Sequence, residues 1–231
     1  MVKSLDIQFS SIDNFSLKAT PVDILYLMYN LKFPTLSADF MKKCCQNMKI
    51  LYVVENNRLE IEKGAFKNMK DLTHLTISKQ NITNLSRDFF EGLEKLAYLN
   101  LKENGILDID ESTFENLTEL NHLILSYNNF TNLKSKTFQK LKVLEVIELQ
   151  GLNFSNFNMT IFNNQKELKV LELPTELIKK KLELSEIIEI FPKLETFGFQ
   201  NENKDDSDVA KFISKCKASG FNVKFSNRFD L

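Results

Sequence analysis

The sequence predicts an α/β solenoid of about nine to ten coils, with a parallel sheet on its concave side and irregular or short helical segments on its convex side. One observation is an apolar pattern that restarts every 24 residues, at Met48, Leu72, Leu96, Leu120, Leu144 and Leu168. A second is a phenylalanine at the same place in five successive repeats, Phe66, Phe90, Phe114, Phe138 and Phe162. Such a period indicates stacked units that bury their apolar faces against one another.

Each repeat predicts a short strand followed by a turn. With the first residue of a repeat as position 1, positions 4 and 6 are apolar, as Leu99 and Leu101 are in LAYLNLKENGI. Alternate residues of a strand share a face, so positions 3 to 7 form a strand whose positions 4 and 6 point inward. The phenylalanine of position 19 is expected to form a spine under the convex side.

Position 9 carries an amide in four successive repeats and then loses it. The four residues are Asn56, Gln80, Asn104 and Asn128, whereas the next two repeats have Leu152 and Glu176. We therefore expect the coils nearer the C-terminus to be less regular.

The chain, 1–231, is expected to form one domain with four stretches. Residues 1–47 form degenerate coils, with repeat starts at Val2 and Ile24 and a short helix capped by Ser37. Residues 48–167 are the regular 24-residue repeats, and residues 168–200 are irregular coils with a helical turn before Pro192. Residues 201–231 form a closing helix through Ala218 and a strand over 221–225.

Composition excludes several classes of function. The net charge is −1, so no global attraction to nucleic acid or to an anionic membrane surface is expected. No apolar run reaches the roughly 18 residues that predict a membrane span. The first residues lack the apolar core of a signal peptide, so either the protein is cytosolic or a signal lies outside this chain.

Cysteine and histidine spacing predicts no metal site and no catalytic centre. Cys44 and Cys45 belong to an early coil and Cys216 to the closing segment, too far apart for a disulfide. Either these cysteines are buried or idle thiols, or one of them is a free thiol used for intermolecular pairing. His74 and His122 both occupy position 3, about 10 Å apart, without an acidic or thiol side chain between them. We expect no enzyme and no cofactor.

The outward strand positions predict a binding surface. Aromatic side chains gather there beside small polar ones, a composition that recognition surfaces favour. The candidate ligand-binding residues are Tyr26, Tyr52, His74, Tyr98, Asn100, Lys102, His122, Ile124, Tyr127 and Glu148. The alternative is that tyrosine is here only because it suits strands.

Seven N-x-[ST] triplets are candidate sites of N-glycosylation. They begin at Asn14, Asn81, Asn84, Asn116, Asn129, Asn153 and Asn158, all outside the inward strand positions. An asparagine-rich composition also produces such triplets by chance. If they are used, the protein passes through the secretory pathway.

The LxxLxLxxNxI pattern, with an aliphatic position 14 and a phenylalanine at position 19, resembles the typical 24-residue class of extracellular leucine-rich repeats. This class includes the repeat regions of Toll receptors and insect immune leucine-rich-repeat proteins. The resemblance implies a leucine-rich repeat horseshoe, in which the position-9 amides satisfy backbone groups of the turn. It also implies a recognition module that binds a protein or a microbial surface ligand on its concave face or flank. The cysteine-rich caps of that class are absent from this sequence.

We therefore expect a secreted, non-enzymatic protein-binding module with an innate-immune or cell-recognition role, able to form a homodimer or heterodimer. The alternative is an intracellular, cytoplasmic leucine-rich-repeat scaffold or regulatory subunit with reduced cysteines and unused glycosylation triplets.

Overall fold

The structure is a computed structural model of the chain, and it describes residues 4–8, 22–28, 35–45, 47–56, 59–179, 182–200 and 206–226. The main sheet contains β1 (Ser4–Gln8), β2 (Ile24–Met28), β4 (Ile50–Val54), β6 (His74–Ser78), β8 (Tyr98–Asn100), β10 (His122–Ile124), β11 (Val146–Glu148), β12 (Val170–Glu172), β13 (Thr196–Gln200) and β14 (Asn222–Ser226). Outside it lie the short strands β3 (Thr35–Leu36), β5 (Glu60–Ile61), β7 (Asn84–Leu85) and β9 (Asp108–Ile109) and the helices α1 (Ala38–Cys44), η1 (Arg87–Phe90), η2 (Met159–Phe162), α2 (Glu176–Lys179), α3 (Leu184–Ile190) and α4 (Ser207–Ala218).

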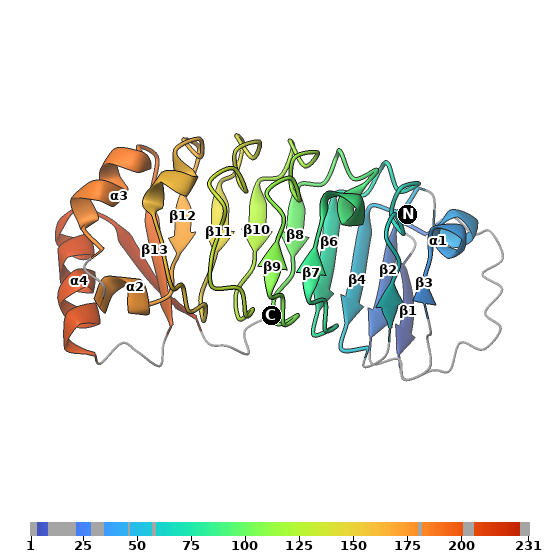
Figure 1. Cartoon of the computed structure of the whole chain (residues 1–231), viewed down its shortest axis with the longest axis horizontal. Helices are drawn as coiled ribbons and strands as arrows, with labels where there is room; N and C mark the ends of the chain where they lie inside the picture. Colours follow the sequence, from blue (N-terminus) through green and yellow to red (C-terminus); the bar gives the residue numbers. More distant parts are fainter. Residues whose placement is uncertain are drawn as a thin grey trace.

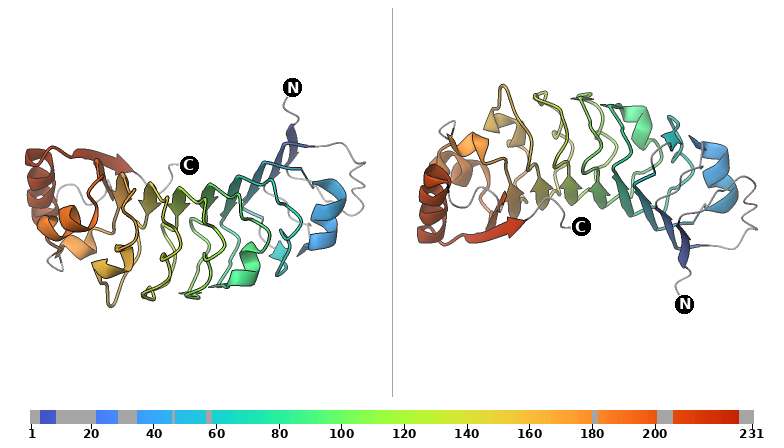
Figure 2. Two further views of the ribbon diagram at one scale, coloured as in Figure 1. Left: turned by 90° about the horizontal axis from the view of Figure 1, so that it is seen from above. Right: turned by 90° about the horizontal axis from the view of Figure 1, so that it is seen from below.

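The ten strands of the main sheet follow one another in chain order, and every neighbouring pair is parallel. From β4 to β12 the register advances by one 24-residue repeat per strand, as in the pairing of His74 with Tyr98 and of Tyr98 with His122. The sheet curves along one side of the molecule, with loops and short helices on the other (Figures 1 and 2). The predicted solenoid with a concave parallel sheet is confirmed.

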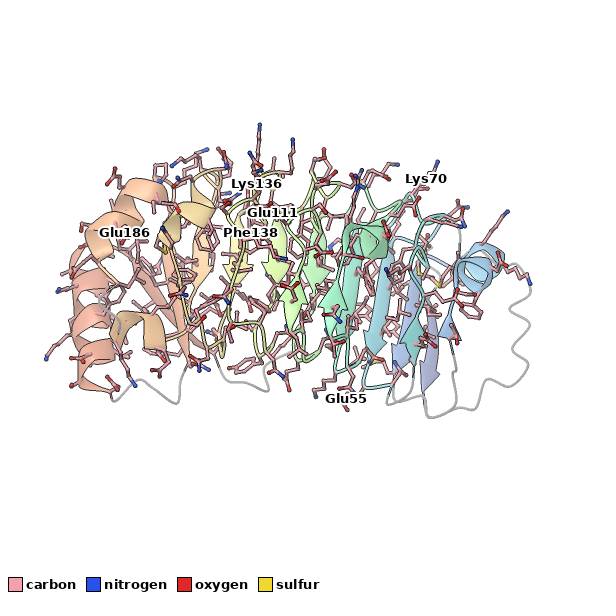
Figure 3. The ribbon with its side chains drawn as sticks, viewed as in Figure 1. Glu55, Lys70, Glu111, Lys136, Phe138 and Glu186 are labelled. Atoms are coloured by element: carbon pink, nitrogen blue, oxygen red, sulfur yellow. The ribbon has the colours of Figure 1, made fainter. Side chains whose placement is uncertain are left out.

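The interior of each coil is filled as the repeat predicts. Leu99 and Leu101, at positions 4 and 6, are completely buried, and so are the five phenylalanines of position 19. Ring centroids of successive phenylalanines lie 5.9 Å apart for Phe90 and Phe114 and 5.5 Å apart for Phe138 and Phe162. Figure 3 labels Phe138 among the side chains of the coil. This continuous column stacks each coil on the next one.

The position-9 amides form the expected ladder. The Asn104 amide nitrogen donates to the carbonyl oxygens of Ile77 and Leu101, at 2.7 and 2.8 Å, and Asn104 Oδ1 accepts from the backbone N–H of Gln80. Asn128 repeats these contacts one coil later. Each buried amide therefore pairs backbone groups that no strand ladder would satisfy.

The predicted register of the second coil is wrong by two residues. Leu25, not Leu27, pairs with Leu51 at position 4, so this coil starts at Val22 rather than at Ile24. Leu25 and Leu27 are both buried and face inward. Because side chains of a strand alternate with period 2, a shift of two residues leaves the apolar pattern unchanged, and the sequence alone could not distinguish the two registers.

The predicted helices are confirmed. Ser37 caps α1 by accepting a hydrogen bond from the backbone N–H of Phe40. Helix α3 ends before Pro192, and Asp206 caps α4, which buries the apolar face that the sequence indicates. The last strand starts one residue later than predicted, at Asn222. No described helix is long and apolar enough to cross a membrane.

The first residue of the turn after the strand adopts a left-handed backbone conformation, which the sequence pattern does not predict. Position 8 has a positive φ in five successive coils, at Glu55, Lys79, Glu103, Tyr127 and Gly151, with values from 53° to 67°. Only the last of these is a glycine, although glycine adopts this conformation most readily. Glu55, which is labelled in Figure 3, forms an ion pair with Lys79 of the next coil.

Candidate binding surface

Two tyrosines stack on the concave face near the N-terminal end. Tyr26 and Tyr52 are paired residues of β2 and β4, and their ring planes are 2° apart with centroids separated by 4.8 Å. Both side chains are half-buried. Burial raises the pKa of Tyr52, and the neighbouring Tyr26 raises it further, so its hydroxyl stays protonated and can donate a hydrogen bond. The corrected register places Tyr26 at position 5, beside Tyr52.

A second aromatic row occupies position 3 of the next three strands. Tyr98 has a histidine ring on each side, with His74 at 5.8 Å and His122 at 4.7 Å between centroids. His74 is exposed, whereas Tyr98 and His122 are half-buried. Each ring packs against rings of neighbouring strands, so the row offers ring edges and polar atoms to a ligand more than open ring faces.

Polar side chains line the carboxyl ends of the central strands. Asn100 Oδ1 accepts a hydrogen bond from the backbone N–H of Lys102 at 2.9 Å. The Lys102 ammonium lies 5.6 Å from the ring centroid of Tyr127, within cation–π range. The Tyr127 ring lies directly against Gly151, where a Cβ atom would be 2.3 Å from the ring. Lys102, Tyr127 and Gly151 therefore form one continuous contact at this edge.

The C-terminal part of the concave face is acidic and covered, a feature that the sequence analysis missed. Glu172, at position 5 of β12, is completely buried, and its carboxylate lies 3.0 Å from the Lys224 ammonium of β14. Burial raises the pKa of Glu172, and the neighbouring Glu148 raises it further, against the opposing effects of Lys224 and Ser226. Position 5 is one of the outward strand positions, for which the sequence predicts an accessible binding surface, so the burial of Glu172 departs from that prediction.

The end of β14 covers this acidic area. The Gln150 side-chain amide donates a hydrogen bond to Ser226 Oγ at 2.7 Å. The Ser226 hydroxyl in turn donates a hydrogen bond to the Glu172 carboxylate at 3.3 Å. Gln150 is 2% exposed. Strand β14 slants toward the middle of the sheet in Figures 1 and 2, which agrees with these contacts.

Nine of the ten predicted ligand-binding residues are accessible on the concave face or its edge. His122 Nε2 lies 3.6 Å from Glu148 Oε1, so the aromatic row of position 3 is in contact with the acidic area. Ile124 is only 7% exposed and offers little surface to a ligand. The remaining predicted residues are partly or fully accessible along the concave face and its edge: Tyr26, Tyr52, His74, Tyr98, Asn100, Lys102, Tyr127 and Glu148.

Five of the six described glycosylation triplets begin with an exposed asparagine. These residues are Asn81, Asn84, Asn129, Asn153 and Asn158. Asn116 is half-buried, and its Oδ1 accepts a hydrogen bond from Arg87 at 3.4 Å. Asn14 lies outside the described residues. Asn81, Asn129 and Asn153 share position 10, immediately after the amide ladder, and so lie along one edge of the solenoid.

The cysteines and histidines do not form a chemical centre in the described residues. Cys45 is buried and disulfide-bonded, so the expectation of an idle thiol is wrong for this residue. Cys216 is a buried free thiol in α4, so no disulfide joins the two ends of the solenoid, as predicted. Burial raises the pKa of Cys216 to about 12, which keeps this thiol protonated and unreactive. The described residues contain no group of three metal-ligating side chains that could hold an ion.

Comparison with known families agrees with this geometry. A family model described as "Leucine rich repeat" matches residues 46–106 and 95–154, which contain the most regular coils and the aromatic row. A search of curated proteins finds no match to the chain. The matched repeats and the ten-stranded parallel sheet together show that the fold is a solenoid containing leucine-rich repeats.

Proposed function

We propose that this protein is a secreted recognition module that binds a protein partner on the N-terminal and central part of its concave face. Leucine-rich repeats generally mediate protein–protein interaction and are typically non-enzymatic. The observation that carries the proposal is the row His74–Tyr98–His122, continued by the Tyr26–Tyr52 stack on the neighbouring strands. A soluble solenoid needs no such row for stability, because the interior is filled from the opposite face of the strands.

The chemistry of the row favours a protein as the partner. Tyrosine and histidine edges present donors and acceptors next to apolar carbon, and the rings are held by their neighbours, so little side-chain freedom is lost on binding. Asn100 and Lys102 add a hydrogen-bonding amide and a cation beside the row. These groups suit the backbone and polar side chains of a partner segment that runs along the concave face.

The exposed glycosylation triplets support the secretory route. Five exposed asparagines lie in turns and on the convex side, none of them in the aromatic row, so glycans there would leave the concave face accessible. An innate-immune or cell-recognition role follows from the resemblance to extracellular repeats and forms part of the proposal. A cytoplasmic scaffold is the competing outcome of the experiment below.

The test is affinity capture with a double variant, Tyr98→Ala with His122→Ala. Wild-type protein and variant, each immobilised, are exposed in parallel to secreted proteins and to cytosolic proteins, and bound proteins are identified by mass spectrometry. A partner retained by the wild type and lost with the variant supports the proposal. The matched control, Lys142→Ala with Val143→Ala, changes two exposed residues off the concave face and must retain the partner.

Two outcomes would contradict the proposal. Equal capture by the wild type and by the Tyr98/His122 variant would remove the aromatic row from the binding surface. Partners found only among cytosolic proteins, with unmodified asparagines, would establish the scaffold instead. The thermal midpoint of each variant is measured alongside, because half-buried concave residues are expected to contribute little to the stability of the coil interior.

A further inference from the structure

The most unusual contact outside the aromatic row joins β12 to β14 over the intervening strand β13. Gly198, in β13, pairs with Glu172 on one side and with Lys224 on the other. A Cβ atom at Gly198 would lie 2.3 Å from Glu172 Cγ and 2.7 Å from Glu172 Oε1. The missing side chain therefore leaves the path along which Glu172 reaches the Lys224 ammonium.

The end of β14 has two specific anchors on this surface. Lys224 contacts the buried Glu172 carboxylate, and Ser226 contacts both Gln150 and Glu172. The rest of the strand is less enclosed, since Asn222 is exposed and Phe225 is 40% exposed. As the last strand of the sheet, β14 pairs with β13 on one side only among the described strands.

We propose that β14 acts as a ligand of its own concave face, filling in cis a subsite that accepts an extended segment with a basic side chain. This inference deepens the proposed binding function, and it names the chemistry of a partner that would use the C-terminal part of the face. The segment must place a lysine or arginine against Glu172 and a hydroxyl or amide two residues later, as Lys224 and Ser226 do.

The charges under β14 explain the preference for a basic segment. Glu148 and Glu172 are paired residues of neighbouring strands, so their carboxylates lie in one column. Two adjacent carboxylates repel each other, and a cation with several N–H donors relieves this repulsion. Gln150 then supplies the hydrogen-bonding partner for the second residue. An acidic or purely apolar segment would leave this column uncompensated.

Hydrogen–deuterium exchange of the full chain tests the cis contact without any ligand. Lys224→Ala removes the ammonium, and Lys211→Ala is the matched control, because Lys211 is an exposed lysine of α4 whose ion pair is with Asp208 of the same helix. We expect the amides of 222–226 to exchange at least about tenfold faster in Lys224→Ala, since loss of the anchor opens the strand end. Unchanged exchange relative to Lys211→Ala overturns the proposal.

A peptide in trans tests the ligand chemistry. The probe is a fluorescent peptide of residues 220–226, GFNVKFS, and its binding to the full chain is followed by anisotropy. We expect the Lys224→Ala chain to bind it at least about tenfold more tightly than the wild-type chain, in which the cis strand competes. Adding Glu172→Gln to that chain, or giving the peptide alanine in place of its lysine, must weaken binding.

Equal affinity of the two chains, or indifference to the lysine of the peptide, overturns the inference. The peptide assay does not involve Tyr98 or His122, so it stays informative if the capture experiment fails. Conversely, a partner lost with the Tyr98/His122 variant would support the proposed function even if the peptide does not bind.

Discussion

Phe114 and Phe138 stack in successive coils with their ring centroids 6.2 Å apart and their planes 20° apart. Both rings are completely buried. Phe114→Ala leaves a cavity in the middle of this column, so we expect a loss of about 3–5 kcal/mol in the free energy of unfolding. Denaturant titration measures the loss. Leu107→Ala, at a position that is 58% exposed, is the control and should change stability by under about 0.5 kcal/mol.

A loss below about 1 kcal/mol for Phe114→Ala would contradict the repeat register, because it would place this ring outside the packed interior.

Asn104→Ala is expected to destabilise the central coils. The amide of Asn104 satisfies the carbonyl oxygens of Ile77 and Leu101 and the backbone N–H of Gln80. The Leu101 carbonyl keeps its hydrogen bond from the Asn128 amide, so alanine removes the side-chain partner of the Ile77 carbonyl and of the Gln80 N–H, at roughly 1–3 kcal/mol for each group that water cannot reach. Thermal unfolding checks the effect against Asn121→Ala, an exposed asparagine on the amino-end edge of the strands. Equal melting of the two variants would show that water replaces the amide.

Glu172→Gln is expected to raise stability at high pH. The pKa of Glu172 is raised above its ordinary value, chiefly by burial. Its contribution to stability is therefore complete below the pKa of the unfolded chain, about 4.3, and is lost as the pH rises through the folded pKa. Glutamine keeps the shape without the charge, so the variant should melt above the wild type at pH 8 and close to it at pH 4.

The control for this comparison is Glu119→Gln, which alters an exposed carboxylate. A Glu172→Gln variant that melts below the wild type at pH 8 would show that the attraction of Lys224 outweighs the cost of burying the carboxylate.

Expression through the secretory pathway of insect cells, with an added signal peptide, should yield protein with several N-glycans. We expect modification at the exposed Asn81 and Asn158 and little at Asn116, whose side chain is half-buried against Arg87. Intact mass gives the number of glycans, and Thr83→Ala should remove one by destroying the triplet of Asn81. A secreted protein without glycans would contradict the proposed use of these triplets.

The repeats could be predicted from the sequence because the spacing of residue types determines the coils. Leu99, Asn104 and Phe114 each have a defined structural role in their coil, and a residue with the same role recurs every 24 residues. The closing helix was equally clear, since Asp206 and the apolar spacing of α4 are local signals. The division of the chain into four stretches and the assignment of ligand residues stay predictions.

The failures have two physical causes. The register of the second coil was predicted wrongly because Leu25 and Leu27 both fit the inward-facing pattern. No turn residue in the sequence distinguished the two possible registers. The burial of Glu172 depends on Gly198 and Lys224, which are 26 and 52 residues away in sequence and meet it only after the strands stack. A periodic pattern describes each coil by itself and therefore carries no information on how the last strand bends over earlier ones.

The contact between Gln150 and Ser226 also bears on the order in which the chain assembles. Apart from the bond between Ser226 and Glu172, which spans 54 residues, the side-chain hydrogen bonds between coils described above join residues 24 to 29 apart, whereas this contact spans 76 residues. Coils can therefore add one after another while the polypeptide leaves the ribosome, each needing only its predecessor. The β14 contact cannot form until residues 222–226 have been synthesised, so Gln150 must wait for a partner three coils further along the solenoid.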